Sequence, residues 1–451
     1  MTIGMNVLNK RKHRVVRDLF FSTIILLSGC AGYQTVPLPD DAVLPGSLNS
    51  FSHERSELPL IDVRDGVDMN EVSIVSIVTN PDLIAARKRE GVAKAQLFAT
   101  RLLPDPQISI GVDHPTSDNP GLSDARNASL NYDLLALLTR SPAVRAQKLA
   151  AVQVRMEIVW QEWQVAQQAR WFFVRERSEA LKLTLLQQAK LQFERRQSAS
   201  AQALREGNIT IENAGPDLTA LLDAGSQWYQ LQQQLNQTGH ELRALLGLSP
   251  DAPLLLDKLP PAPSPVKQNV ATIMPSVIAI RPDLLALQAG YASQEARVRR
   301  AVLRFFPALA IGLARAVDTS AVYTSGMVLS LDLPLFAGNR GELRIERATR
   351  DQLWSEYQAR ITQTRSDISR LINEQRILDQ RRQFIHGHIP ELEQMVVGAR
   401  RAYASRDIDT LVYLNLEFAL INKKIELIDL EQALWEISIA LDTITAKELR
   451  M

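Results

Sequence analysis

The chain has 451 residues, 46% hydrophobic and 22% charged, with 51 basic and 50 acidic side chains. These proportions are those of a folded protein and exclude a largely disordered chain. A formal net charge of +1, without a basic patch interleaved with aromatic residues, gives no indication of nucleic-acid binding.

The first 29 residues have the pattern of an export signal. Basic residues between Lys10 and Arg17 precede the apolar run Leu19 to Leu27, which is too short to span a bilayer as a helix. The run ends in Leu27-Ser28-Gly29-Cys30, which resembles the lipobox of a bacterial lipoprotein. That resemblance implies cleavage before Cys30 and acylation of its thiol, with palmitate among the chains. The alternative is an ordinary signal peptide with a chance cysteine.

Cys30 is the single cysteine of the chain, so no disulfide can form within it. Ala31 follows it, where lipoproteins retained in the inner membrane carry an aspartate. The resemblance therefore favours the outer membrane, with the rest of the chain extending into the periplasm. Several acyl chains anchor a protein stably where one would be marginal.

Two proline-rich segments divide the remaining chain. Residues 30–70 contain proline and glycine with little periodicity, which predicts an extended, lipidated N-terminal arm. Residues 250–275 carry seven prolines, which disfavour a continuous helix. We therefore predict a first repeat over 71–249, a linker over 250–275 and a second repeat over 276–451.

The two predicted repeats share a pattern. Asn80-Pro81-Asp82-Leu83 returns as Arg281-Pro282-Asp283-Leu284, and the strand-like residues 106–111 return at 307–312. Each copy reads as a helix, two amphipathic strands and a very long helix.

Long helical stretches dominate both copies. Residues 143–206 lack glycine and proline, and these 64 residues would form a helix of about 95 Å. Residues 342–386 and 399–451 are similarly free of both. Such lengths indicate coiled coils or stacked helices. Trp160, Trp163 and Trp171 are interpreted as helix packing, not as a ligand cage.

Four segments alternate between apolar and polar residues, as strands do. They lie at about 106–116, 126–134, 307–317 and 326–334. Ten alternating residues are enough for a membrane β-strand with one face to lipid. The alternative is a pair of soluble hairpins packed on helices. Four strands cannot close a barrel alone, and an open edge in hydrocarbon is costly, so membrane strands would need partner chains. Three chains would supply twelve strands.

Three short motifs give these segments a family resemblance. They are Asn80-Pro81-Asp82-Leu83, Leu102-Leu103-Pro104 and Leu333-Pro334-Leu335-Phe336. In this order, over residues 71–451 and behind a lipobox, they resemble the TolC-like outer-membrane efflux factors. The resemblance implies a mainly α fold with a small membrane β part, made of two repeats of long coiled-coil helices with one two-stranded hairpin each.

The same resemblance implies a homotrimer whose twelve-stranded β-barrel is continued by an α-helical barrel. Such a duct passively conducts small molecules or ions supplied by a periplasmic adaptor and an inner-membrane transporter of a tripartite efflux system. It is not an enzyme, and it needs no cofactor besides the lipid on Cys30. No phosphate-binding glycine loop, zinc-protease motif or nucleophile elbow occurs in the sequence.

The helix-to-helix turns are candidate contacts with the adaptor. The residues concerned are Arg205, Gly207 and Asn208 in the first copy and Arg406 and Asp407 in the second. The second turn lacks a glycine, and Asn213-Ala214-Gly215-Pro216 predicts an extra break in the first copy only. The alternative is that both turns are simply solvated hairpins.

Asp407 and Asp409 are candidate gate residues. In a threefold ring each inward carboxylate occurs three times, so the aperture would concentrate negative charge and favour cations. The alternative is that they face solvent or pair with Arg400, Arg401 or Arg406.

No metal site is expected. His386-Gly387-His388, close to Pro390, is interpreted as a helix interruption, because no cysteine or carboxylate cluster completes a coordination sphere.

Two further functions stay open from the sequence: the outer-membrane component of a type I protein secretion system, and a non-spanning coiled-coil periplasmic lipoprotein that acts as adaptor or scaffold. The sequence carries no recognisable pocket that identifies an exported substrate.

Overall fold

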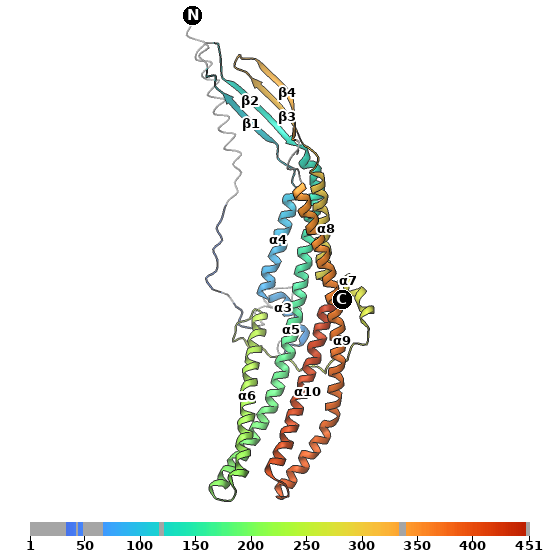
Figure 1. Cartoon of the computed structure of the whole chain (residues 1–451). Coiled ribbons are helices and arrows are strands. Elements are labelled where there is room, and N and C mark those ends of the chain that lie inside the picture. The colour runs from blue at the N-terminus through green and yellow to red at the C-terminus, as the bar shows by residue number, and fades with distance from the viewer. Residues whose placement is uncertain (1–32, 42–43, 48–65, 117–120, 333–339, 448–451) are drawn as a thin grey trace. The chain divides into compact units, whose positions relative to one another are not determined.

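The computed structural model describes residues 33–41, 44–47, 66–116, 121–332 and 340–447 (Figure 1). The chain divides into a unit of residues 1–44 and a unit of residues 45–451. The described residues of the first unit contain no helix or strand. All elements below belong to the second unit.

Within the described residues the second unit repeats one order of elements. The first copy consists of α3 (Met69–Thr79), α4 (Pro81–Arg101), β1 (Gln107–Asp113), β2 (Ala125–Asp133), α5 (Leu134–Arg205) and α6 (Ile211–Leu245). The second consists of α7 (Val270–Ile280), α8 (Pro282–Leu303), β3 (Ala308–Val317), β4 (Tyr323–Asp332), α9 (Arg340–Ala404) and α10 (Thr410–Thr445). The predicted fold class, mainly helical with a small antiparallel sheet, is confirmed.

The starts of α4 and α8 show how the copies diverge. Both helices open with proline, whose missing N–H costs nothing at a first helical position. Asn80 caps α4 by accepting from the Leu83 N–H at 2.9 Å. Arg281 cannot cap α8; instead its guanidinium makes a bidentate ion pair with Asp283, at 2.6 and 2.9 Å, over the ring of Trp160.

The long helices run further than the sequence predicted. α5 has 72 residues, roughly 108 Å, and α9 has 65. The predicted interruption over His386–Pro390 is wrong, because α9 continues through it. The predicted extra break at Asn213–Pro216 is also wrong, since α6 begins at Ile211 and continues through Pro216. Helix also reaches into the predicted linker, because α7 begins at Val270 and contains Pro275.

These prolines are tolerated for a common reason. A proline leaves the carbonyl four residues earlier without its helical partner. For Pro216 and Pro390 that carbonyl belongs to an exposed residue, Glu212 or His386, so water can bond to it. At these two positions the unpaired carbonyl can therefore bond to solvent, and the helix continues past the proline.

The four strands form one antiparallel sheet in the order β1-β2-β3-β4. Their bounds differ from the predicted ones by a few residues at either end. β4 begins three residues before its predicted start and is described to Asp332. The expected motif Leu333-Pro334-Leu335-Phe336 lies outside the described residues.

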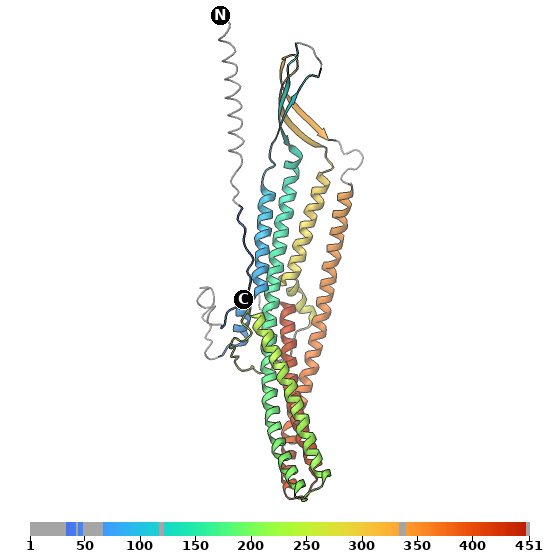
Figure 2. The same cartoon turned by 90° about the vertical axis from the view of Figure 1, so that its left-hand side faces the viewer.

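The sheet lies at one end of the helices (Figures 1 and 2). α4, α5, α8 and α9 lead away from it, and the α5–α6 and α9–α10 hairpins turn at the opposite end. Among the described helices, no single one is both long and apolar enough to cross a membrane; α7 and α8, bent by 56°, meet that criterion only as a pair.

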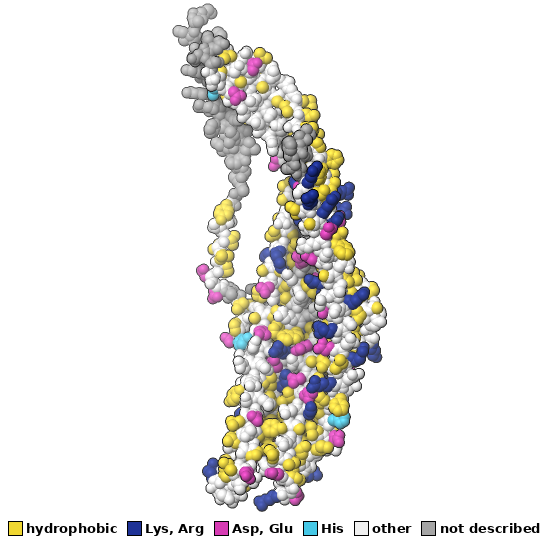
Figure 3. Space-filling model, viewed as in Figure 1, with side chains coloured by type: hydrophobic (Ala, Val, Ile, Leu, Met, Phe, Trp, Pro, Cys, Tyr) yellow, Lys and Arg dark blue, Asp and Glu magenta, His cyan; other side chains and the backbone are white. Residues whose placement is uncertain are grey.

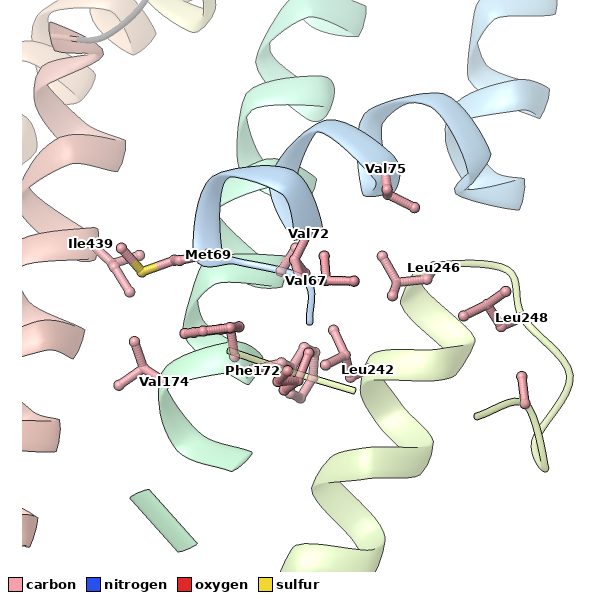
Figure 4. Packing of buried hydrophobic residues seen from close by; sticks show 14 residues of the cluster. Val67, Met69, Val72, Val75, Phe172, Val174, Leu242, Leu246, Leu248 and Ile439 are labelled. Carbon is pink, nitrogen blue, oxygen red and sulfur yellow. The ribbon is translucent and has the colours of Figure 1, made fainter. Parts of the chain in front are cut away.

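The hydrophobic core lies where the short helices α3 and α7 pack on the long ones. In the first copy, Val72 of α3 packs with Phe172 of α5 and with Leu242 and Leu246 of α6 (Figure 4). In the second, α7 contributes Val277 to a cluster with α8, α9 and α10. A third, smaller cluster around Phe193 joins α5 and α6 to α10. The helices are therefore fixed to one another between the sheet and the turns.

Candidate functional site

The sheet has one apolar face and one face of small and polar side chains. The register places Ile108, Leu130, Leu313 and Met327 in one row across the four strands. The next row, on the opposite face, is Ser109, Ser129, Ala314 and Gly326. Large side chains of the apolar row are uncovered, with Leu313 60% and Met327 74% exposed. An exposed apolar face of this extent marks contact with lipid or another protein.

Charge on the apolar face is confined to one end. Among the described strand residues of this face, the charged ones are Arg126 and Arg315, which lie towards the loops that join the strands. Between them and the helices, the face carries Tyr132, Ile311 and Leu329 in one row. An apolar band that ends in cationic side chains fits a membrane whose surface lies near the loops.

Both outer strands of the sheet have a free edge. Within the described residues, β1 pairs with β2 alone and β4 pairs with β3 alone. Along the seven residues of β1 and the ten of β4, alternate residues direct their N–H and C=O groups outward, and these groups need water or another strand. In hydrocarbon only another strand can satisfy them.

At the opposite end, the two helix turns have the same backbone. Gly207 and Arg406 are both left-handed, with φ of 73° and 65°. The following N–H groups, of Asn208 and Asp407, donate to the carbonyls of Ala203 and Ala402, each at 2.8 Å. This six-to-one hydrogen bond defines a Schellman motif. The sequence predicted that the two turns differ, because the second lacks a glycine. For the backbone that prediction is wrong, since Arg406 adopts the same left-handed conformation as Gly207.

The turns hold the predicted contact residues at the surface. Arg205 is the last residue of α5, and Asn208 donates from its side chain to Glu206 at 3.0 Å. Asp407 accepts a hydrogen bond from the Ser405 hydroxyl at 2.5 Å. Asp409 immediately precedes α10 and makes no side-chain cap.

Asp407 and Asp409 are both exposed. The alternative to a gate is that they face solvent or pair with Arg400, Arg401 or Arg406; the described residues include no such ion pair, and in the single chain both side chains face solvent. Their role as gate residues stays a prediction, because an aperture would form only between several chains.

Above the turns, Arg196 of α5 joins all four helices. Its Nη2 lies 3.1 Å from Oδ1 of Asp217 on α6, and its Nη1 lies 3.3 Å from Oε2 of Glu417 on α10. The guanidinium also lies over the rings of Tyr403 on α9 and Tyr413 on α10. We call these five residues, together with Arg400, the Arg196 cluster.

Further hydrogen bonds complete the Arg196 cluster. Tyr413 donates to Glu417 at 2.8 Å, and Arg400 donates to the Tyr413 hydroxyl at 3.2 Å. Burial raises the pKa of Tyr413; the hydrogen bond from Arg400 opposes that rise, and the bond to Glu417 adds to it. Asp217 and Glu417 are only 2% and 5% exposed, so Asp217 depends on Arg196, and Glu417 depends on Arg196 and on Arg400, which lies 3.4 Å away.

The sequence did not indicate the Arg196 cluster, because its members come from four helices.

The sequence also did not indicate a polar hollow between α5 and α6. It has a volume of about 740 Å³ and is lined by Glu176, Tyr229, His240 and Arg243, among others. Burial raises the pKa of Glu176, partly opposed by Arg243 and Arg177. Its Oε2 is buried without a hydrogen-bond partner.

The remaining residues singled out in the sequence are the tryptophans, the two histidines of α9 and Cys30. Trp163 is buried and donates to the Thr443 carbonyl at 3.1 Å, in keeping with a packing role. Nδ1 of His388 lies 2.8 Å from the Phe384 carbonyl oxygen. The part of the chain that the structure describes contains no group of three or more side chains able to hold a metal ion. Cys30 lies outside the described residues, so its acylation remains a prediction.

No protein-family model matches this sequence, and no curated protein matches it. Solved structures do match the chain in fold. The outer membrane channel CmeC of Campylobacter jejuni superimposes with a TM-score of 0.73 at 13% identity, over 93% of this chain and 98% of that one. The outer membrane protein VceC of Vibrio cholerae gives 0.69 at 16%, over 84% and 95%. The outer membrane channel MtrE of Neisseria gonorrhoeae, in its open state, gives 0.67 at 14%, over 92% and 97%.

Proposed function

We propose that this chain, which has the fold of the TolC-family outer-membrane channels, is one subunit of a homotrimeric exit duct in a bacterial outer membrane. The observation that carries the proposal is the open sheet, with an exposed apolar face and two free edges at one end of the helices. Three copies would pair β4 of one subunit with β1 of the next. The resulting twelve strands lie within the range of outer-membrane barrels.

The other face of the sheet suits the inside of such a duct. Ser109, Ser129 and Ala314 leave room for a wet lumen because their side chains are small. The duct passively conducts small molecules or ions delivered from an inner-membrane transporter through a periplasmic adaptor, and it performs no chemistry itself. This assignment rests on the fold shared with CmeC, VceC and MtrE.

The helix turns are the proposed contact with the adaptor. Arg205, Gly207, Asn208, Arg406 and Asp407 form two exposed turns of equal backbone geometry at the end of the helices away from the sheet. Arg406 keeps a conformation that costs energy for any residue with a Cβ. The left-handed backbone of Arg406 supports a role for its side chain in binding a partner. Asp407 and Asp409 are the proposed gate residues of the assembled trimer.

An acylated Cys30 would place the duct as an outer-membrane lipoprotein. The basic n-region, the short apolar run and the lipobox support this assignment. Labelling with a radioactive or clickable fatty acid tests it: the wild type should incorporate label and Cys30→Ser should not. Equal labelling of the two proteins would refute acylation at Cys30.

The test of the duct uses the strand edges. In a Cys30→Ser background, Gln107→Cys and Asp332→Cys place thiols at the helix-side ends of β1 and β4. Oxidation of the double variant should yield covalent trimers, whereas either single variant should give at most dimers. Independently, the unmodified chain should be trimeric in detergent and should conduct ions in planar bilayers. A stable monomer without conductance would overturn the proposal and favour the non-spanning scaffold.

A further inference from the structure

A concentration of arginine occurs where α8 and α9 meet the sheet. We define the arginine cluster as Arg297, Arg299, Arg300, Arg304, Arg340, Arg344, Arg347 and Arg350. Four acids lie in the same two helix segments, namely Glu295, Glu342, Glu346 and Asp351. The segments are therefore strongly basic in a chain whose basic and acidic residues are otherwise almost balanced.

Most of these arginines have no ionic partner. Arg304 pairs with Glu342 at 2.8 Å, and Arg350 pairs with Asp351 at 2.9 Å. The other six form no ion pair within the described chain, and five of them are exposed: Arg297, Arg299, Arg340, Arg344 and Arg347. In the sixth, Arg300, the Nε is buried without a hydrogen-bond partner. Unpaired guanidinium groups at this density call for anions from outside the chain.

The position of the cluster indicates which anions are available. Figure 3 shows basic side chains gathered on the flank of the helices directly below a part of the sheet edged with hydrophobic side chains. Arg304 is followed by Phe305 and Phe306, which are 39% and 58% exposed, and then by β3. From helix to sheet, the surface thus changes from cationic to aromatic to apolar.

The first copy has the same order of residues. Arg101 ends α4 and is followed by Leu102 and Leu103, which are 57% and 62% exposed, before β1 begins. A cation followed by exposed apolar side chains suits a membrane surface, where the charge stays at the headgroups and the apolar groups enter the acyl chains.

We propose that the arginine cluster binds the headgroups of anionic phospholipids in the membrane leaflet on the helix side of the sheet. The inference rests on the proposed function, since it requires the sheet to span a membrane. The guanidinium group suits this role because it donates two parallel hydrogen bonds to a phosphate and is always charged. The bound lipids would fix the depth at which the sheet lies in the bilayer.

The test measures the lipids that stay bound to the full chain. The protein is reconstituted into nanodiscs of phosphatidylethanolamine and phosphatidylglycerol in equal parts, released, and weighed with its retained lipids by native mass spectrometry. We expect phosphatidylglycerol to be enriched about fivefold or more over phosphatidylethanolamine. Arg344→Gln with Arg347→Gln should remove most of that enrichment, and lysine at both positions should keep part of it.

A matched control lies further along the same helix. Arg365 and Arg376 of α9 are exposed, form no ion pair among the described residues, and lie more than about 25 Å from Arg347 along the helix axis. Changing both to glutamine should leave the enrichment unchanged. Equal loss in the control pair would show a general charge effect and overturn the proposal.

Other outcomes are equally decisive. Displacement of phosphatidylglycerol by millimolar inorganic phosphate would indicate a free-anion site, and preference for lipid A would place the cluster at the other leaflet. Dissociation of the oligomer by Arg344→Gln with Arg347→Gln would assign the arginines to a contact between copies. Each of these results overturns the lipid proposal. A chain that inserts and conducts without enrichment refutes this inference alone, whereas a chain that never inserts refutes the proposed function.

Discussion

Gly207 and Arg406 occupy the same position in the two helix turns and share the left-handed conformation, although one has no side chain and the other has a long one. Both are preceded by a helix and followed by an N–H that closes the same six-to-one hydrogen bond. The turn geometry is therefore set by the duplicated backbone, and the side chain of Arg406 is an addition to it.

This relationship predicts opposite effects for two substitutions. Arg406→Gly should stabilise the α9–α10 turn by about 1 kcal/mol, because glycine adopts the left-handed region without the Cβ penalty. Gly207→Ala should destabilise the α5–α6 turn by a similar amount; its Cβ would meet nothing within 4 Å, so the cost is purely conformational. Hydrogen exchange at the two turns measures both effects. If Arg406→Gly is destabilising, the arginine side chain must be held by contacts within its own subunit.

The same variant also tests the proposed adaptor contact. Arg406→Gly should weaken adaptor binding even though it strengthens the turn, because the side chain that reaches outward is lost. Arg401→Gln, an exposed change in the last turn of α9, is the control. Undiminished adaptor binding by Arg406→Gly would remove Arg406 from the interface.

The Arg196 cluster should contribute strongly to the contact between the two hairpins. Arg196→Met leaves the buried carboxylate of Asp217 without its cation and Glu417 with Arg400 alone, and we expect it to destabilise this end by about 3 kcal/mol. The control is Glu426→Gln, which breaks exposed pairs with Arg381 and Lys423 and should cost under about 1 kcal/mol. Limited proteolysis near the turns reports the difference. Equal protection of the two variants would show that the cluster is energetically neutral.

The sequence was informative where one residue's neighbours in the chain determine its structure. Alternation in residues 106–116 and 307–317 predicted strands, because the period of a strand depends on local geometry alone. Pro216 and Pro390 misled the prediction, because the local preference of proline to end a helix is weaker than the packing that a long helix gains with its neighbours. The Arg196 cluster was invisible for a related reason: Arg196 and Glu417 are 221 residues apart.

Adjacent residues on β4 should respond oppositely to a charge. Leu329 lies on the apolar face and is 69% exposed, whereas Ser330 lies on the other face. In a lipid-facing strand, Leu329→Lys should cost about 2–4 kcal/mol and reduce assembly in the membrane, while Ser330→Lys should be tolerated by a wet lumen. Assembly is measured as the amount of oligomer that resists heating on a gel, and as the folded fraction in vesicles. The reverse order of effects would mean that the apolar face points inward.

The buried carboxyl of Glu176 predicts a pH-dependent stability. Burial raises the pKa of Glu176, so the folded state favours its protonated form, and the stability this contributes is lost as the pH rises through the raised value. Glu176→Gln mimics the neutral acid; it should match the wild type below the ordinary glutamate pKa and exceed it in free energy of unfolding at neutral and alkaline pH. Denaturant unfolding across this range measures the difference, with the exposed Glu157→Gln on the same helix as the control. A variant less stable than the wild type at neutral pH would mean that attraction from Arg243 outweighs the burial of the charge.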